Sequence, residues 1–497
     1  MKPLTDLLFA ILILAAAEPT SAQVFTILHT FTQDHSNPVS GLLTNFDGLN
    51  PNAGLVISSN LLFGAAQGGG TNGTGTIFSL RTDGTDFTVL HTFSATTLNS
   101  TNMDIAVGTN EDGAFPCPEA SLALSGNKLY GTARNGGTNG FGTVFSLNTD
   151  GTEFSVLHIF NNDDGRSPVG GVVLSGDTLY GITTIGTSNF NGTIYSLKTN
   201  GSDFTVLHIF SAAPSPNTNW DGARSQAGLT LFNDTLYGTA FHGGPNDQGT
   251  IFSIRTDGSN FTVLHSFSQD IYDAPLFTYT NFDGAHPNAN LTLAGNTLYG
   301  TAIQGGLFGD GTVFSLDTAG LDFNAVHTFE GGPSGWFPAS GVLVSGNTLY
   351  GGTTRGGSSA YGTIYSVGRS GLGYQVVHNF SGPDGRAPDP NLLLSGNTLY
   401  GATVAGGAYD NGIIFSLTIP PLVITSFDVA GLDVIINAAN GLAGETYKVL
   451  ASPDLTLSVA HWSSIASTNL TANGNFSMVV TNPAPTAAQR FFVLQRQ

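Results

Sequence analysis

Seven of the 11 histidines in this 497-residue chain occupy the same position of a repeated apolar segment. Imidazole binds metal ions and transfers protons near neutral pH, so an ordered set of histidines is a candidate for chemistry. A metal site needs three or four ligands within about 2 Å of one ion, which equivalent positions of separate repeats do not provide. We therefore interpret the set as structural and expect neither a metal nor another cofactor. Its members are His29, His91, His158, His208, His265, His327 and His378.

The residues around His158 predict how its buried ring is satisfied. Phe154, Val156 and His158 share one face of a strand, because side chains alternate along it. A two-residue turn at Asp150-Gly151 would bring Thr143 on the preceding strand opposite His158. A buried imidazole requires a hydrogen-bond partner. We predict a threonine–histidine hydrogen bond between these two strands in every repeat.

An Asp-Gly pair precedes the first strand of six repeats, and Ser334-Gly335 replaces it in the remaining one. A calcium-binding loop would show several alternating Asp or Asn ligands and a downstream glutamate. Here the aspartate usually stands alone, so we interpret it as part of a turn that leads into the strand. The six aspartates are Asp47, Asp112, Asp164, Asp221, Asp283 and Asp384.

A third set of residues is suited to binding a ligand. Arginines and aromatic residues occur in the segments that join the strands, where guanidinium groups and rings favour polysaccharides or peptides. Two interpretations remain open. These residues form a binding site, or the aromatic rings cap the repeats while the arginines pair with the Asp-Gly carboxylates. The candidates are Arg134, Arg166, Trp220, Arg224, Trp336, Arg355, Tyr361 and Arg386.

The motif Leu-(Tyr/Phe)-Gly marks seven repeats, and one repeat takes about 50 residues, as between Leu129 and Leu179. This length accommodates four strands with their turns. In the second repeat we predict strands at residues 121–124, 128–133, 143–147 and 154–160. The two middle strands are apolar at almost every position, which is typical of sheets covered on both faces.

The number of fourth strands indicates a closed ring. This strand occurs seven times, but the first copy, residues 25–31, precedes the first repeat, and no copy follows residues 413–417 of the last repeat. Pairing these two segments would remove the exposed edges that a linear stack leaves. We predict an all-β protein, with a seven-bladed β-propeller and N-terminal strand closure over residues 23–419. An open β-solenoid is the alternative.

The motifs Leu-Tyr-Gly-Thr, Gly-Thr-Val-Phe-Ser-Leu and Phe-Ser-Val-Leu-His resemble the tandem repeat of the GloVer (Gloeobacter/Verrucomicrobia) family, over residues 24–419. The resemblance implies a bacterial repeat protein that is extracellular or exposed on the cell surface, and it carries over no catalytic residues. Residues 422–497 contain six short apolar segments and resemble the small β-sandwich modules of secreted verrucomicrobial proteins. We expect a small C-terminal β-sandwich there.

Residues 1–22 have the pattern of a secretory signal peptide. Lys2 precedes an apolar stretch at residues 7–17, and small residues precede an expected cleavage before Gln23. A retained N-terminal anchor is the alternative. No later apolar stretch reaches the length of a membrane span. We expect a secreted or cell-surface protein that has no integral membrane segment after signal removal.

The net charge of −20, from 34 acidic and 14 basic residues, narrows the range of partners. Such a charge repels the phosphates of nucleic acids and the surface of anionic membranes, so we expect no nucleic-acid partner. A single cysteine, Cys117, excludes an internal disulfide. Stability must therefore come from burial and hydrogen bonding.

In a propeller, the connections from one blade to the next share a face with the connections between the two middle strands. Half of the propeller's lysines and arginines and all of its long insertions lie in these connections. Recognition usually occupies variable loops on a rigid scaffold. We expect a binding or interaction scaffold for polysaccharide or a cell-surface protein. The alternatives are a purely architectural role and an extracellular carbohydrate-active enzyme, a hydrolase or lyase. Glycoside hydrolysis would need two carboxylates beside the substrate.

Overall fold

The computed structural model describes residues 23–38, 40–98, 108–116, 121–212, 218–275, 278–388 and 391–419 of the predicted propeller. In the C-terminal region it describes residues 423–430, 433–441, 446–452, 463–470, 474–480 and 491–496. The predicted signal peptide and Cys117 lie outside these ranges. The described part is all-β apart from one 3-10 turn, η1 (Gly332–Ser334). Within it, no helix has the length and hydropathy that a membrane crossing requires.

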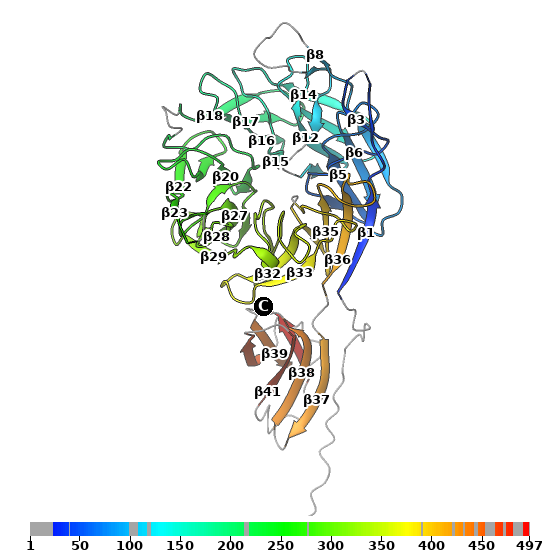
Figure 1. Ribbon diagram of the computed structural model, residues 1–497. Coiled ribbons are helices and arrows are strands. Elements are labelled where there is room, and N and C mark those ends of the chain that lie inside the picture. The colour runs from blue at the N-terminus through cyan, green and yellow to red at the C-terminus, as the bar shows by residue number, and fades with distance from the viewer. Residues whose placement is uncertain are drawn as a thin grey trace, which may run out of the picture.

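Seven antiparallel sheets are arranged as blades around a common axis (Figure 1). Each blade has an inner, a second, a third and an outer strand, as predicted. The first blade is β4 (Val56–Ser58), β5 (Leu61–Ala66), β6 (Thr76–Arg81) and β7 (Thr88–Thr92). The second is β11 (Ala123–Ser125), β12 (Lys128–Asn135), β13 (Thr143–Asn148) and β14 (Ser155–Ile159). The third is β15 (Val172–Ser175), β16 (Thr178–Thr183), β17 (Thr193–Lys198) and β18 (Thr205–Ile209).

The other four blades repeat this order. The fourth is β19 (Thr230–Phe232), β20 (Thr235–Ala240), β21 (Thr250–Arg255) and β22 (Thr262–Ser266). The fifth is β26 (Thr292–Ala294), β27 (Thr297–Gln304), β28 (Thr312–Asp317) and β29 (Asn324–Thr328). The sixth is β30 (Leu343–Ser345), β31 (Thr348–Thr353), β32 (Thr363–Gly368) and β33 (Gln375–Asn379). The seventh is β34 (Leu393–Ser395), β35 (Thr398–Thr403), β36 (Ile413–Thr418) and β1 (Val24–Thr30).

Short strands occur in the connections that lead from one blade to the next. β10 (Ala114–Pro116) and β25 (Ala285–Pro287) pair with the second strands of the second and fifth blades. Three connections carry an extra hairpin. These hairpins are β2 (His35–Ser36) with β3 (Leu43–Thr44), β8 (Thr97–Leu98) with β9 (Gly108–Thr109), and β23 (Ile271–Asp273) with β24 (Thr278–Thr280).

The N-terminal strand closes the ring. β1 pairs antiparallel with β36, so that Phe25 lies opposite Leu417 and Thr30 opposite Ile413. Figure 1 shows these two strands, from opposite ends of the propeller sequence, side by side. The predicted closure is confirmed, and it excludes the open solenoid.

The propeller core consists of layers between neighbouring blades. One such layer joins Tyr130 and Val144 of the second blade to Leu179 and Tyr195 of the third. The Leu-Tyr-Gly motif contributes to this packing through its glycine. A Cβ atom on Gly238 would lie 2.6 Å from Cζ of Phe252, so the neighbouring ring occupies the space of a side chain. The middle strands are buried on both faces, as their continuous apolar pattern predicts.

The predicted threonine–histidine hydrogen bond is wrong, because each outer strand contains a β-bulge. In the second blade Phe145 lies opposite Val156, as predicted, but the register then shifts. Val144 lies opposite His158, and Thr143 faces Ile159 instead. A bulge adds one residue to one strand, which redirects every side chain beyond it. The Thr143 hydroxyl donates to the backbone carbonyl of Asp112 at 3.1 Å.

Six of the seven histidines pair instead with the aspartate of the following Asp-Gly pair. Nε2 lies 2.9–3.1 Å from a carboxylate oxygen in each case, and these imidazoles are 16–20% exposed. The aspartate also accepts the backbone N–H that follows the outer strand, as Asp47 does from Thr32. Burial acts to raise the pKa of Asp47, but hydrogen bonds from His29 and Thr32 hold it below the usual value. The pairs are His29–Asp47, His91–Asp112, His158–Asp164, His208–Asp221, His265–Asp283 and His378–Asp384.

Each of the seven imidazoles stacks on an aromatic ring that begins the outer strand of the next blade. The rings are nearly parallel, with centroids 3.7–4.0 Å apart. The seventh stack joins His378 to Phe25 and therefore crosses the closure of the ring. The stacked pairs are His29–Phe87, His91–Phe154, His158–Phe204, His208–Phe261, His265–Phe323, His327–Tyr374 and His378–Phe25.

One blade interface departs from this pattern. Ser334 stands where the other repeats have aspartate, and Nε2 of His327 is buried without a hydrogen-bond partner among the described residues. Tyr374 replaces the usual phenylalanine there, and its hydroxyl donates to the backbone carbonyl of Ser334. Burial lowers the pKa of His327 from 6.5 to about 4.

The C-terminal region contains two three-stranded sheets, which confirm the predicted small β-sandwich. Val434, Ile436, Tyr447 and Val449 form its core together with Met478. One sheet is β37 (Val423–Ala430), β38 (Asp433–Gly441) and β41 (Gly474–Val480). The other is β40 (Ser463–Asn469), β39 (Thr446–Ser452) and β42 (Phe491–Arg496).

The first prediction concerns the imidazole that lacks a carboxylate. We expect His327 to remain neutral until the pH approaches 4, and the substitution Ser334→Asp to raise its pKa, because a carboxylate stabilises imidazolium. Imidazole NMR signals recorded against pH measure both values. The control is Ser395→Asp, at an exposed position in the seventh blade, which should leave the His327 titration unchanged. A wild-type pKa near 6, or no change in Ser334→Asp, would contradict the assignment.

The sign of the associated stability effect follows from the same shift. The unfolded chain protonates this imidazole near pH 6.5, whereas the folded chain does so near 4. The unfolded state therefore binds more protons in this window. The stability contributed by neutral His327 is complete above pH 6.5 and is lost as the pH falls towards 4.

The second prediction concerns ring closure. Phe25 is half-buried, stacks on His378 and packs against Phe380 and Phe415. We expect Phe25→Ala to lower the free energy of unfolding by about 2–3 kcal/mol, because it removes the last inter-blade stack. Phe46→Ala is the control, since Phe46 is 72% exposed and should change stability by less than about 0.5 kcal/mol. Urea denaturation measures the difference, and equal effects of the two substitutions would contradict this role for Phe25.

Candidate ligand site at the channel mouth

One residue in every repeat is held in the left-handed backbone region where the chain enters the inner strand. Its φ lies between 51° and 62° in all seven repeats, although none of the seven is glycine. Such residues cluster at functional sites, because the surrounding structure must hold them in a strained conformation. They follow the Asp-Gly pair by two positions and precede a proline in six repeats. The seven are Asn50, Phe115, Ser167, Arg224, His286, Phe337 and Ala387.

Contacts with the preceding blade hold this conformation. The backbone N–H of Phe115 donates to the carbonyl of Thr74 at 2.8 Å, and equivalent bonds occur at the other six interfaces. At the closure, the N–H of Asn50 donates to the carbonyl of Asn411 at 3.0 Å. The following proline packs on a glycine of the preceding blade. A Cβ atom on Gly412 would lie 2.5 Å from Cδ of Pro51. These contacts place seven side chains at fixed positions on one face of the propeller.

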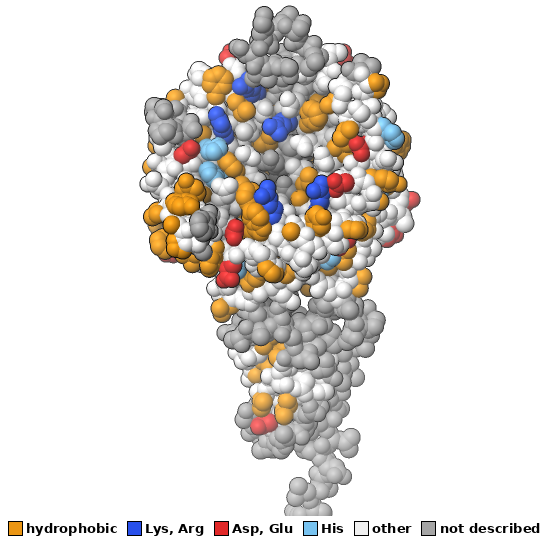
Figure 2. All heavy atoms as spheres, in the orientation of Figure 1, with side chains coloured by type: hydrophobic (Ala, Val, Ile, Leu, Met, Phe, Trp, Pro, Cys, Tyr) orange, Lys and Arg blue, Asp and Glu red, His pale blue; other side chains and the backbone are white. Residues whose placement is uncertain are grey.

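This face carries a positive centre. Figure 2 shows lysine or arginine side chains gathered around the hollow in the middle of the ring. The five predicted arginines differ in their partners. Arg386 makes two hydrogen bonds to the Asp410 carboxylate, at 2.8 and 2.6 Å. Arg355 lies over the rings of Trp336 and Phe337, at 5.1 and 5.2 Å from their centroids.

Like Arg355, the remaining three arginines have no carboxylate partner in the described part of the chain. Arg166 lies over Phe141 and Phe190, at 5.7 and 5.6 Å from the ring centroids. Arg134 and Arg224 are exposed and form no ion pair with the described residues. The alternative that the arginines pair with the Asp-Gly carboxylates is therefore wrong. Those carboxylates bind the histidines instead.

The opposite face of the propeller shows a different arrangement of cations. There each lysine or arginine has a partner among the described residues. Four form ion pairs, namely Arg81–Asp86, Lys128–Glu153, Lys198–Asp177 and Arg255–Asp234. Arg369 donates to the Tyr299 hydroxyl at 2.7 Å. Positive charge without a neutralising carboxylate is thus concentrated at the channel mouth.

The structure separates Trp220 from this arginine set. Its indole is 59% exposed and meets the edge of Phe261, at a centroid distance of 5.7 Å. It borders an open hollow of about 570 Å³ together with Val263 and Ser266 of the outer strand β22. Tyr361 is 40% exposed, and its carbonyl accepts the N–H of Ala387, which follows Arg386. The structure therefore brings Tyr361 to the mouth and leaves Trp220 at the rim.

Sequence reasoning missed several residues of the mouth. His286 stacks on Phe241 at 4.8 Å, and its Nδ1 lies 3.0 Å from the Phe241 carbonyl oxygen. His242 is 5.2 Å from the same imidazole, and chiefly burial lowers its pKa although Asp247 opposes this. The spacing Asp-Gly-x-x-Pro carried the signal for the left-handed position, since its fourth residue is His286 in the fifth repeat. Among the described residues, no group of three or more potential ligands is arranged to hold a metal ion.

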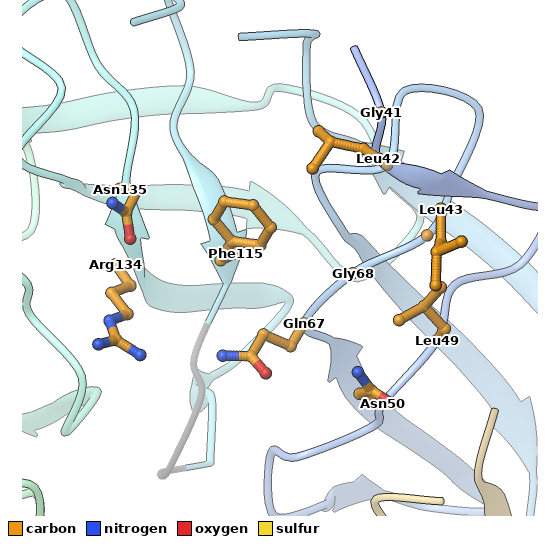
Figure 3. A pocket seen from close by; sticks show the side chains of 12 residues that line it. Gly41, Leu42, Leu43, Leu49, Asn50, Gln67, Gly68, Phe115, Arg134 and Asn135 are labelled. Atoms are coloured by element: carbon orange, nitrogen blue, oxygen red, sulfur yellow. The ribbon is translucent and has the colours of Figure 1, made fainter. Parts of the chain in front are cut away.

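A cleft of about 490 Å³ opens between the first and second blades (Figure 3). Leu42 and Leu43 of the hairpin β2–β3 form one wall. Phe115 and Arg134 of the second blade form the opposite side. Figure 3 shows the Phe115 ring between Arg134 and Leu42, with the amide of Gln67 below it.

Fold and repeat together define a β-propeller built from tandem copies of one sequence motif. A family model described as the Gloeobacter/Verrucomicrobia repeat matches residues 96–277 and 272–447. The chain belongs to this family. The match confirms the resemblance read from the repeat motifs, and it extends past the last propeller strand to the start of β39. A search of curated proteins found no match.

Several solved structures resemble the fold at low identity. A nidogen/laminin complex matches at 15% identity and a TM-score of 0.31, covering 56% of this chain and 77% of the other. An oligogalacturonate lyase in complex with manganese matches at 11% identity and a TM-score of 0.44, covering 80% of this chain and 98% of the other. A putative TolB from Agrobacterium tumefaciens matches at 11% identity and a TM-score of 0.34, covering 68% of this chain and 95% of the other. Similarity at this level carries no argument about activity or ligand.

Proposed function

We propose that this chain is a secreted or surface-exposed binding protein whose ligand contacts the channel mouth. The observation that supports the proposal is the asymmetry of its cations. On the opposite face the described lysines and arginines have side-chain partners, whereas Arg134 and Arg224 at the mouth lack a carboxylate. In a chain of net charge −20, unneutralised arginines attract an anionic or strongly hydrogen-bonding ligand.

The surroundings of the mouth also favour binding. Contacts between blades fix the backbone of the left-handed residues, so little conformational entropy is lost when a ligand binds. The hairpins β2–β3, β8–β9 and β23–β24 extend from connections on this face. Trp336 and Phe337 provide aromatic surface beside Arg355. Aromatic planes beside planar cations suit the apolar faces and hydroxyl groups of a polysaccharide.

The third prediction tests the mouth directly. We expect the double substitution Trp336→Ala and Arg355→Gln to weaken binding to the strongest ligand of a glycan array at least tenfold. The substitution removes an aromatic surface and the cation stacked on it. Isothermal titration calorimetry measures the affinity. Arg255→Gln is the control, because Arg255 pairs with Asp234 on the opposite face. Unchanged binding by the double variant would eliminate this part of the mouth as the site.

One observation favours the alternative of a carbohydrate-active enzyme. Burial raises the pKa of Asp310, whose backbone carbonyl accepts the N–H of Phe337 at the mouth. A carboxyl group with a raised pKa is what a general acid for glycoside cleavage requires. Hydrolysis would also need a second carboxylate about 5–10 Å away.

The fourth prediction separates binding from catalysis. We expect the wild-type chain to release no reducing ends from a glycan that it binds, and Asp310→Asn to keep the same affinity. A reducing-sugar assay and calorimetry on the same glycan measure the two properties. The control is Asp257→Asn, in an exposed turn of the fourth blade. Release of reducing ends that Asp310→Asn abolishes and Asp257→Asn preserves would replace the binding proposal with the enzymatic one.

A further inference from the structure

We infer that the cleft between the first two blades binds an acidic sugar unit, a uronate, of the polysaccharide. This inference rests on the proposed function and names the chemistry of one subsite. At about 490 Å³, the cleft lies within the range of small-molecule sites, roughly 300–1,000 Å³. Its lining comes from two blades and the hairpin β2–β3, so its shape depends on elements distant in sequence.

The charge of the cleft selects an anion. Arg134 is the single charged residue among the described residues that line it. Its guanidinium is exposed and forms no ion pair in the described part of the chain. A guanidinium binds a carboxylate through two parallel hydrogen bonds, which gives direction as well as attraction. No acidic lining residue competes for that position.

An aromatic ring beside the arginine supplies the apolar contact that a sugar needs. Phe115 has a φ of 58°, and its backbone N–H is bound to the carbonyl of Thr74, so the ring starts from a fixed backbone. The ring lines the cleft, and Figure 3 shows it between Arg134 and Leu42. The C–H face of a pyranose ring packs on such an aromatic surface, while the leucines close the other side.

Amide side chains supply partners for the hydroxyl groups. Asn50, Gln67 and Asn135 line the cleft, and their side chains form no hydrogen bond with the described residues. Each amide offers two N–H donors and a carbonyl acceptor. Their distribution on both sides of Phe115 matches a ligand with hydroxyl groups around its rim.

The combination of an arginine with this aromatic ring and these amides occurs at one blade interface. The positions equivalent to Arg134 are Gln67, Thr184, Phe241, Ile303, Thr354 and Val404, none of which carries a charge. The extra hairpin β2–β3 closes the cleft on the first-blade side. The same backbone arrangement therefore recurs at all seven blade interfaces, but only this interface has an arginine at the position of Arg134.

Calorimetry on the full chain with a trigalacturonate tests the inference. We expect trigalacturonate to bind, neutral cellotriose to bind at least tenfold more weakly, and Arg134→Gln to weaken trigalacturonate binding at least tenfold. Arg255→Gln is the matched control, because Arg255 pairs with Asp234 on the opposite face and lies outside the cleft lining. It should change the affinity less than twofold. Phe115→Leu keeps an apolar side chain but removes the ring, and should weaken binding several-fold.

Four outcomes would overturn the inference. They are no binding of trigalacturonate at millimolar concentration, equal binding of cellotriose, no effect of Arg134→Gln, and equal binding of a short polyglutamate. The proposed function fails separately, when the Trp336 and Arg355 double variant keeps its glycan affinity. Far-ultraviolet circular dichroism and the urea midpoint of each variant identify any loss of folding. If Arg134→Gln proves unstable, Arg134→Lys keeps the charge without the two-point geometry and should still bind more weakly.

Discussion

The propeller depends on a three-part contact between neighbouring blades, made by an aspartate, a histidine and an aromatic ring. The aspartate holds Nε2 of the histidine, and the imidazole face lies on the aromatic ring of the next blade. In each contact the histidine lies on the outer strand of one blade, the aspartate in the connection to the next blade, and the aromatic ring at the outer strand of that next blade. Because Phe25 forms the seventh stack, the N-terminal strand closes the ring with the same histidine–aromatic contact that joins the other blades.

The blade contacts also decide what the channel mouth can present. The left-handed residues are tied to the preceding blade by a backbone hydrogen bond, and the prolines that follow most of them pack on glycines. Side-chain identity at these positions is therefore free to vary, from Ala387 to Arg224, while the backbone stays fixed. The charged side chains also differ between the two faces of the propeller. Cations on the opposite face have local partners, whereas most of those at the mouth are stacked on aromatic rings or exposed to solvent.

Much of this architecture could be predicted from the sequence, and the errors have physical causes. Seven copies of the outer-strand segment predicted the closure of residues 25–31 onto 413–417, which β1 and β36 confirm. The histidines were interpreted as structural, but the predicted hydrogen-bond partner, a threonine, was wrong. A strict two-residue alternation placed Thr143 opposite His158, and the bulge moved Val144 there. The sequence pattern does not reveal the bulge, because Val156, Leu157, His158 and Ile159 are all half-buried and show no alternation.

Sequence by itself determined the number of blades, the closure and the set of residues available at the loop face, because repetition fixes topology when every strand must find a partner. Only the tertiary structure decided which aspartate meets which histidine, and which arginines lack a carboxylate. It also separated Trp220 at the rim from Tyr361 at the mouth, and joined Phe115 to Gln67 across a blade interface. These relations link positions in different repeats, so they depend on how the blades pack, which the order of residues along one strand does not specify.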